Sequence, residues 1–124
     1  MPRVLIVDDA PTVRMYHRQV IEEMGVEAEE AENGIEALEK CLTRAFDLLL
    51  VDVNMPKMDG YRFLREVRTH PELRAVPAVM ISTEAGEGDR AQAFAAGANH
   101  YIVKPVRPEA LRACVRVLVG GGRR

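Results

Sequence analysis

The stretch Leu48-Leu49-Leu50-Val51-Asp52 is an apolar run that ends in a carboxylate. Three further short runs have the same form, since each consists of strand-forming residues and ends in polar groups. Runs that are apolar on both sides indicate strands buried within a parallel sheet. A weaker strand is predicted at 26–31. The three further runs are Val4-Leu5-Ile6-Val7 before Asp8-Asp9, Ala78-Val79-Met80-Ile81 before Ser82-Thr83, and Tyr101-Ile102-Val103 before Lys104-Pro105.

Between these runs the apolar spacing changes to that of an amphipathic helix. Pro11 suits a first helical turn, and Asp59 is a predicted N-cap. Gly25 and Gly97 suit helix stops, and the last helix follows Pro108. The apolar stripes expected to face the sheet are Val13, Tyr16, Val20 and Met24; Ile35, Leu38 and Leu42; Phe63, Leu64 and Val67; Ala91, Phe94 and Ala95; and Leu111, Val115 and Leu118.

Five strands that alternate with five helices predict an α/β fold with a parallel sheet covered on both sides. Right-handed crossovers favour a doubly wound sheet. The length fits a single domain, which is predicted at 1–119, and a flexible glycine-rich tail is predicted at 120–124.

The composition argues against several classes of protein. The formal net charge of -2 lacks the basic excess of a dedicated nucleic-acid binder. No apolar run approaches the roughly 20 residues that cross a membrane. The first residues, Met1-Pro2-Arg3, lead into a strand without a signal-peptide pattern. We therefore expect a cytoplasmic protein without direct nucleic-acid contacts or membrane insertion.

Ligands of a doubly wound sheet bind outside the carboxyl ends of its strands. Closely packed carboxylates repel one another and favour a bound cation. Oxygen donors without softer ligands favour Mg²⁺ or Mn²⁺ over zinc. One carboxylate could then form an aspartyl phosphate, while the metal, the lysine and a hydroxyl stabilise the transferred group. The groups expected at these strand ends are Asp8, Asp9, Asp52, Ser82, Thr83 and Lys104.

Each of these residues has an ordinary explanation when it is taken alone. A strand-end Asp is more often a helix cap or a turn residue, and a Lys-Pro pair is usually a surface turn. The set is more specific than its members, because four different strands each end in a chemically useful group.

The strand-end motifs resemble those of the receiver domains of two-component response regulators, of the stand-alone, CheY-like type. The resemblance runs in order from about residue 3 to 118. It implies a flavodoxin-like strand order 2-1-3-4-5, with the first and fifth helices on one face. Cys41 and Cys114 would then lie on opposite faces, and no disulfide is expected between them. The matching motifs are Val7-Asp8-Asp9, Val51-Asp52-Val53-Asn54-Met55-Pro56, Met58-Asp59-Gly60, Ile81-Ser82-Thr83-Glu84-Ala85, Ala96-Gly97-Ala98 and Val103-Lys104-Pro105.

The resemblance implies a role for each matching residue. Asp52 is the expected phospho-acceptor, and Lys104 is expected to contact the phosphoryl group. Asp9 would bind the metal directly, Asp8 mainly through water, and Asn54 through its backbone carbonyl, with Asp52 as a further ligand. The peptide bond before the proline that follows Lys104 is usually cis in this family.

The resemblance also implies a conformational switch. It favours Ser82 as the switch hydroxyl, a choice that the pattern alone left open between Ser82 and Thr83. Phosphorylation is expected to draw Ser82 inward, so that Tyr101 settles into the vacated space. The surface of the fourth helix, fifth strand and fifth helix would then change. Asn54 and Glu84 occupy positions that tune autodephosphorylation.

The implied function is that of a single-domain response regulator in phosphorelay signalling, with chemotaxis as one candidate pathway. A histidine kinase or phosphotransfer protein would donate the phosphoryl group, and an output protein would bind the switch surface. The chain would be a monomer or weak dimer. It would catalyse its own phosphorylation and dephosphorylation without being a conventional enzyme. Gly86-Glu87-Gly88 stands where CheY carries lysines, so the basic part of a flagellar-motor surface is missing.

The sequence leaves three alternatives to this function. The chain could be a receiver domain cut from a multidomain regulator. It could be a phosphorylation-independent binding module, although such modules typically lose the acids or the lysine. An aspartate-nucleophile phosphohydrolase of the haloacid dehalogenase type would need Asp-x-Asp, whereas this chain has Asp52-Val53-Asn54.

Overall fold

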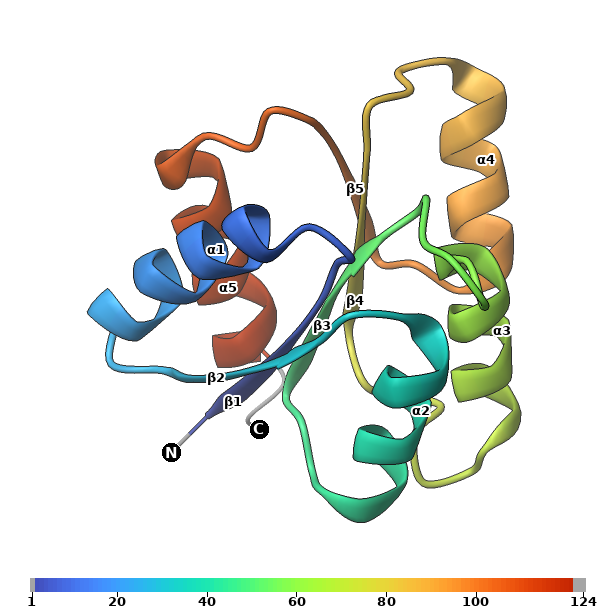
Figure 1. The fold of residues 1–124 in the computed structure, drawn as a ribbon, viewed down its shortest axis with the longest axis horizontal. Helices are drawn as coiled ribbons and strands as arrows, with labels where there is room; N and C mark the ends of the chain where they lie inside the picture. The colour runs from blue at the N-terminus through green and yellow to red at the C-terminus, as the bar shows by residue number, and fades with distance from the viewer. Residues whose placement is uncertain (1, 122–124) are drawn as a thin grey trace.

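The computed structural model describes residues 2–121, in which strands alternate with helices (Figure 1). The five strands form one parallel sheet in the order β2-β1-β3-β4-β5. The predicted doubly wound α/β fold and strand order are therefore confirmed. The strands are β1 (Arg3–Val7), β2 (Glu27–Ala31), β3 (Leu48–Asp52), β4 (Ala78–Ser82) and β5 (His100–Val103). The helices are α1 (Pro11–Glu23), α2 (Gly34–Thr43), α3 (Gly60–Thr69), α4 (Glu87–Ala96) and α5 (Pro108–Gly121).

Helices cover both faces of the sheet, with α1 and α5 on one side and α2, α3 and α4 on the other (Figure 1). Cys41 packs in the core under α2 to α4, and Cys114 packs in the core under α1 and α5. Both thiols are free, as predicted. Burial raises the pKa of Cys41 to about 12 and that of Cys114 to about 11, so both remain protonated at neutral pH.

Several helix ends follow the signals in the sequence. Pro11 is the first residue of α1, and the Asp59 carboxylate caps α3 by accepting the Arg62 amide at 2.9 Å. Gly97 ends α4 with φ at 114°, in the left-handed region that favours glycine. The predicted tail overlaps α5, which continues through Gly121. Residues 122–124 of that tail lie outside the described residues, so its flexibility stays a prediction.

The stripe predicted for α4 is wrong. Phe94 is 49% exposed and Ala91 and Ala95 are exposed, whereas Ala93 and Ala96 face the core. Alanines occupy both sides of this helix, so apolar periodicity carries little information about its orientation. The large aromatic ring is left on the outer side, and small residues make the contact with the core.

The stripe predicted for α2 is also wrong in part. Ile35 and Leu42 are exposed, while Leu38 packs partly against the core. Ala37 and Cys41 make the fully buried face. The predicted stripes of α3 and α5 do face the core. On α1, Val20 is buried, but Tyr16 is 36% exposed and donates a hydrogen bond to the Val106 carbonyl in the β5–α5 loop.

Arg68 joins the end of α3 to two other segments. Its guanidinium donates to the carbonyl of Gly97 at 2.7 Å, and to those of Val76 at 2.8 Å and Leu73 at 3.3 Å. Burial lowers the pKa of Arg68, yet the side chain stays charged at neutral pH. Its contacts are therefore charge-assisted hydrogen bonds to backbone oxygens of the α3–β4 loop and the end of α4.

We expect Arg68→Met to lower the free energy of unfolding by about 2–4 kcal/mol, because it leaves partly buried carbonyls without their donor. Urea unfolding measures the loss. Arg65→Met is the matched control, since Arg65 is an exposed arginine on the same helix. The control should change stability by no more than about 0.5 kcal/mol. Equal losses in the two variants would contradict this role for Arg68.

Among residues 2–121, no helix has both the length and the apolar character needed to cross a membrane.

Candidate functional site

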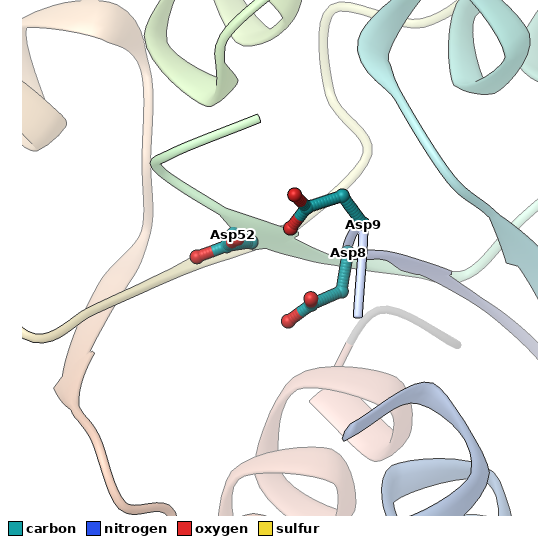
Figure 2. Close-up of side chains that lie close together, drawn as sticks. All are labelled: Asp8, Asp9 and Asp52. Atoms are coloured by element: carbon teal, nitrogen blue, oxygen red, sulfur yellow. The ribbon is translucent and has the colours of Figure 1, made fainter. Parts of the chain in front are cut away.

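Three carboxylates meet at the carboxyl edge of the sheet (Figure 2). Asp8 and Asp9 follow β1, and Asp52 is the last residue of β3. The register of these neighbouring strands pairs Val7 with Val51, so both strands end at the same level. One oxygen of each carboxylate lies within 4.8 Å of the other two. Asp8 and Asp52 are buried and Asp9 is exposed, so the cluster opens to solvent on the Asp9 side.

The backbone around the carboxylates is closely held. The Asp8 carboxylate accepts the Ala10 amide at 2.8 Å, and the Asp8 amide donates to the Ala31 carbonyl at 3.1 Å. Gly60 begins α3 directly against the end of β3, where an added Cβ would collide with the Asp52 carbonyl oxygen. Glycine at position 60 therefore lets α3 start beside Asp52 without displacing it.

Lys104 brings a positive charge to this cluster from the end of β5. Its Nζ lies 3.1 Å from Asp52 Oδ1 and 3.5 Å from Asp8 Oδ2. The Lys104 amide also donates to the Ser82 carbonyl at 2.7 Å, which ties the residue to the end of β4. The Lys104–Pro105 peptide is cis, as predicted.

The charges of the site act on one another. Burial raises the pKa of Asp52, the Asp8 carboxylate raises it further, and the Lys104 ammonium opposes both. Burial alone would lower the pKa of Lys104, but the carboxylates of Asp52 and Asp8 outweigh burial and the net shift is upward. Lys104 is therefore an ammonium at neutral pH, within hydrogen-bonding distance of the Asp52 carboxylate.

The backbone of Glu84 connects the two predicted switch residues. Its amide donates to the Ser82 hydroxyl oxygen at 3.0 Å, and its carbonyl accepts the Tyr101 hydroxyl at 2.6 Å. Ser82 and Tyr101 are buried, with 1% and 3% of their surfaces exposed. Tyr101 thus occupies an inward position. The side chain of Glu84 is exposed.

The other two predicted residues lie at the rim of the site. Thr83 is exposed and lines a cavity of about 330 Å³ beside Lys104 and α1, while Ser82 is the buried hydroxyl. Asn54 is exposed in the β3–α3 loop, two residues after Asp52. The fold therefore places the predicted strand-end residues along the carboxyl edge of the sheet, with Ser82 inside and Thr83 outside, whereas Tyr101 lies within β5.

Two residues near the site were not singled out by the sequence. The Arg90 guanidinium lies over the Tyr101 ring, with its carbon 5.1 Å from the ring centre. His17 is 2% exposed and lines the same cavity as Lys104. Burial lowers the pKa of His17, and of the nearby charges Asp8 opposes this shift while Lys104 adds to it. The only sequence signal for His17 is its place on the inner side of α1, four residues after Val13.

The donor set fits a hard divalent cation. Every ligand that the three acids offer is a carboxylate oxygen, and no Cys or His belongs to the cluster as it is described. The Asp8 carboxylate helps to raise the pKa of Asp52, so a cation would relieve the repulsion between these two acids.

Residues 4–116 match the response regulator receiver domain family. The chain belongs to this family. It is a CheY-like receiver domain, which is a signalling module of two-component systems and not a conventional enzyme.

Individual relatives agree with this assignment. The chain is 38% identical over 120 residues to chemotaxis protein CheY1 of Helicobacter pylori, covering 95% of this chain and 97% of the relative. The solved structure of Vibrio cholerae CheY4 superposes with a TM-score of 0.91 at 35% identity, covering 95% of this chain and 98% of that one. The receiver domain of sensor histidine kinase PA1611 from Pseudomonas aeruginosa superposes with a TM-score of 0.89 at 28% identity, covering 96% and 98% of the two chains. That structure has a magnesium ion coordinated in its active site cleft.

Proposed function

We propose that this receiver domain accepts a phosphoryl group on Asp52 from a histidine kinase or phosphotransfer protein, and acts as a stand-alone cytoplasmic regulator. The observation that carries the proposal is the Lys104 ammonium, 3.1 Å from the Asp52 carboxylate inside an all-oxygen acidic cluster. The domain extends over 1–119 in this proposal. It acts as a monomer or weak dimer in a phosphorelay, of which chemotaxis is one candidate.

The chemistry is an in-line transfer to a carboxylate oxygen. A bond forms between the Asp52 oxygen and phosphorus, while the bond from phosphorus to the donor's histidine nitrogen breaks. Lys104, 3.1 Å from Asp52 Oδ1, would neutralise charge on the phosphoryl oxygens, and the buried Ser82 hydroxyl would donate to one of them. Mg²⁺ or Mn²⁺, when bound, supplies further charge neutralisation. Its ligands would be Asp8, Asp9, Asp52 and the backbone carbonyl of Asn54.

The backbone of Glu84 would transmit the structural change from the phosphorylation site to Tyr101. A Ser82 hydroxyl that turns toward a phosphoryl oxygen gives up its bond from the Glu84 amide. The Tyr101 hydroxyl donates to the carbonyl of Glu84. A shift of the β4–α4 loop, which contains Glu84, would therefore move the Tyr101 side chain or break this hydrogen bond. The surface formed by α4, β5 and α5 would then bind an output protein differently.

We expect the phosphoryl group to be short-lived, with a half-life of seconds to minutes when Mg²⁺ is present. Asn54 and Glu84 both place exposed side chains near the site, where they can influence access of water. Loss of the adduct after removal of the donor can be followed by intact-protein mass spectrometry. A half-life of many hours would contradict this prediction.

Incubation of the full chain with acetyl phosphate and Mg²⁺ tests the proposed function. One phosphoryl group should be added per chain, and an excess of EDTA should prevent the addition. The absence of any adduct with Mg²⁺ would favour a phosphorylation-independent binding module. Rapid turnover of simple phosphate monoesters would favour a phosphohydrolase, although Asn54 cannot protonate a leaving group.

A further inference from the structure

Arg14, near the start of α1, reaches back to the backbone of the acidic cluster. Its guanidinium Nη1 donates to the Asp8 carbonyl oxygen at 2.6 Å, and its Nε donates to Glu30 Oε1 at 2.8 Å. The Arg14 side chain is only 14% exposed. Glu30 lies on β2, so the guanidinium joins α1, the end of β1 and β2 at one point.

The carbonyl that Arg14 holds belongs to the peptide between Asp8 and Asp9. The orientation of this peptide sets the direction in which the Asp9 side chain leaves the backbone. The Asp8 amide and carboxylate are already bonded to Ala31 and Ala10. The contact with Arg14 therefore leaves the peptide little freedom to rotate.

An arginine suits this position better than another cation. The planar guanidinium offers several donors in a fixed arrangement, so it can bind a carbonyl and a carboxylate together. Glu30 is held in turn by Arg18, whose Nη1 lies 2.8 Å from its other oxygen. Hydrogen bonds from Arg18 lower the pKa of Glu30, burial opposes this, and Arg14 adds to it, with a net downward shift. Glu30 is thus a charged, fixed support for Arg14 at neutral pH.

We propose that Arg14 is a positioning residue for the divalent cation site. Arg14, supported by Glu30, holds the Asp8–Asp9 peptide in the orientation in which the Asp9 carboxylate faces the cation. Cation binding then loses no free energy to ordering this loop. The inference rests on the proposed function, because it assumes that Asp8, Asp9 and Asp52 bind Mg²⁺. It adds a residue outside the acidic cluster that controls the affinity of the site.

Calorimetric titration of the unphosphorylated full chain with Mg²⁺ tests this role directly. Arg14→Met keeps an unbranched stem and removes the guanidinium, and we expect its Kd for Mg²⁺ to rise about 10- to 100-fold. Arg18→Met is the matched control, because it also removes an ion pair to Glu30 but leaves the Asp8 carbonyl contact. Its Kd should stay within about threefold of the native value. Arg14→Lys should show an intermediate loss, since one ammonium replaces the two-sided contact.

Phosphorylation provides a second readout. With acetyl phosphate as donor, Arg14→Met should be slow at low Mg²⁺ and approach the native rate as Mg²⁺ saturates. Far-ultraviolet circular dichroism and urea unfolding would establish that each variant is folded. If Arg14→Met fails to fold, Arg14→Lys and Glu30→Gln carry the test by the same titration.

The outcomes separate this inference from the proposed function. Equal Mg²⁺ affinity in folded Arg14 variants and the native chain would overturn the positioning role while leaving phospho-acceptance intact. Equal weakening in Arg14→Met and Arg18→Met would overturn it too, because the loss would then come from Glu30 alone. A native chain that binds no Mg²⁺ and forms no adduct would overturn both.

Discussion

Asp52→Asn is expected to take up no phosphoryl group from acetyl phosphate at any Mg²⁺ concentration. The neutral amide lacks the anionic oxygen that attacks phosphorus, and the neighbouring Asp8 is already bonded to the Ala10 amide and Lys104. Intact-protein mass spectrometry measures the adduct. A variant that is still phosphorylated to the native extent would show that Asp52 is not the acceptor.

The same substitution should stabilise the metal-free chain. Folding buries Asp52 beside Asp8 and raises its pKa, so the ionised carboxylate lowers stability at neutral pH. Asp52→Asn removes this cost and should raise the free energy of unfolding at pH 7, in the presence of EDTA, by about 1 kcal/mol. Mg²⁺ should narrow the difference in the free energy of unfolding, because the cation stabilises the native chain more than a variant that lacks one of its carboxylate ligands.

The increase in the free energy of unfolding caused by Asp52→Asn should be larger at high pH than at low pH. It is fully present above the folded-state pKa of Asp52 and declines as pH falls through that value. It disappears below the unfolded pKa of about 3.9, where the carboxyl is protonated in both states. Urea unfolding at pH 7 and near pH 4 measures the change, with Glu39→Gln on the exposed side of α2 as a control. An equal gain at both pH values would contradict this electrostatic explanation.

Lys104→Met is expected to slow phosphorylation of Asp52 by about 100- to 1,000-fold, the effect typical of removing one donor that stabilises a transition-state oxyanion. It should also weaken the metal-free fold at pH 7, because Asp52 and Asp8 lose the ammonium that lies within 3.5 Å of both. Phosphorylation reactions with acetyl phosphate, quenched at successive times, give the phosphorylation rate. Urea unfolding in EDTA gives the free energy of unfolding of the metal-free chain.

Lys104→Arg is the control for charge. It keeps the cation but changes its shape, so it should preserve most of the stability while still losing phosphorylation rate. If Lys104→Met phosphorylates as fast as the native chain under saturating Mg²⁺, Lys104 does not contact the transferring group. In that case its role would be confined to balancing the charge of the two acids.

The architecture could be predicted because its signals are local and repeated. Four apolar runs each end in a polar group, and parallel strands bring such ends to one edge. The meeting of Asp8, Asp9 and Asp52 follows from that topology without any side-chain detail. The orientation of α4 could not be predicted, because alanines surround Phe94 and leave its apolar side undefined.

The contacts that sequence reasoning missed are made by backbone atoms or by side chains that join separate elements. The amide and carbonyl of Glu84 join Ser82 to Tyr101, and a backbone atom has no residue-type signal. The contact of Arg14 with the Asp8 carbonyl likewise depends on how α1 packs beside the end of β1. Arg90 reaches Tyr101 only because α4 packs beside β5. These contacts are set by packing, which the apolar pattern does not specify in such detail.

Asp52 alone is expected to carry the phosphoryl group. Borohydride reduces an acyl phosphate to an alcohol and so marks the modified residue permanently. After treatment with acetyl phosphate and Mg²⁺, reduction and peptide mass spectrometry should place the mark at Asp52 and leave Asp8 and Asp9 unmodified. A mark at Asp8 or Asp9, or no mark on a chain that binds Mg²⁺, would contradict it.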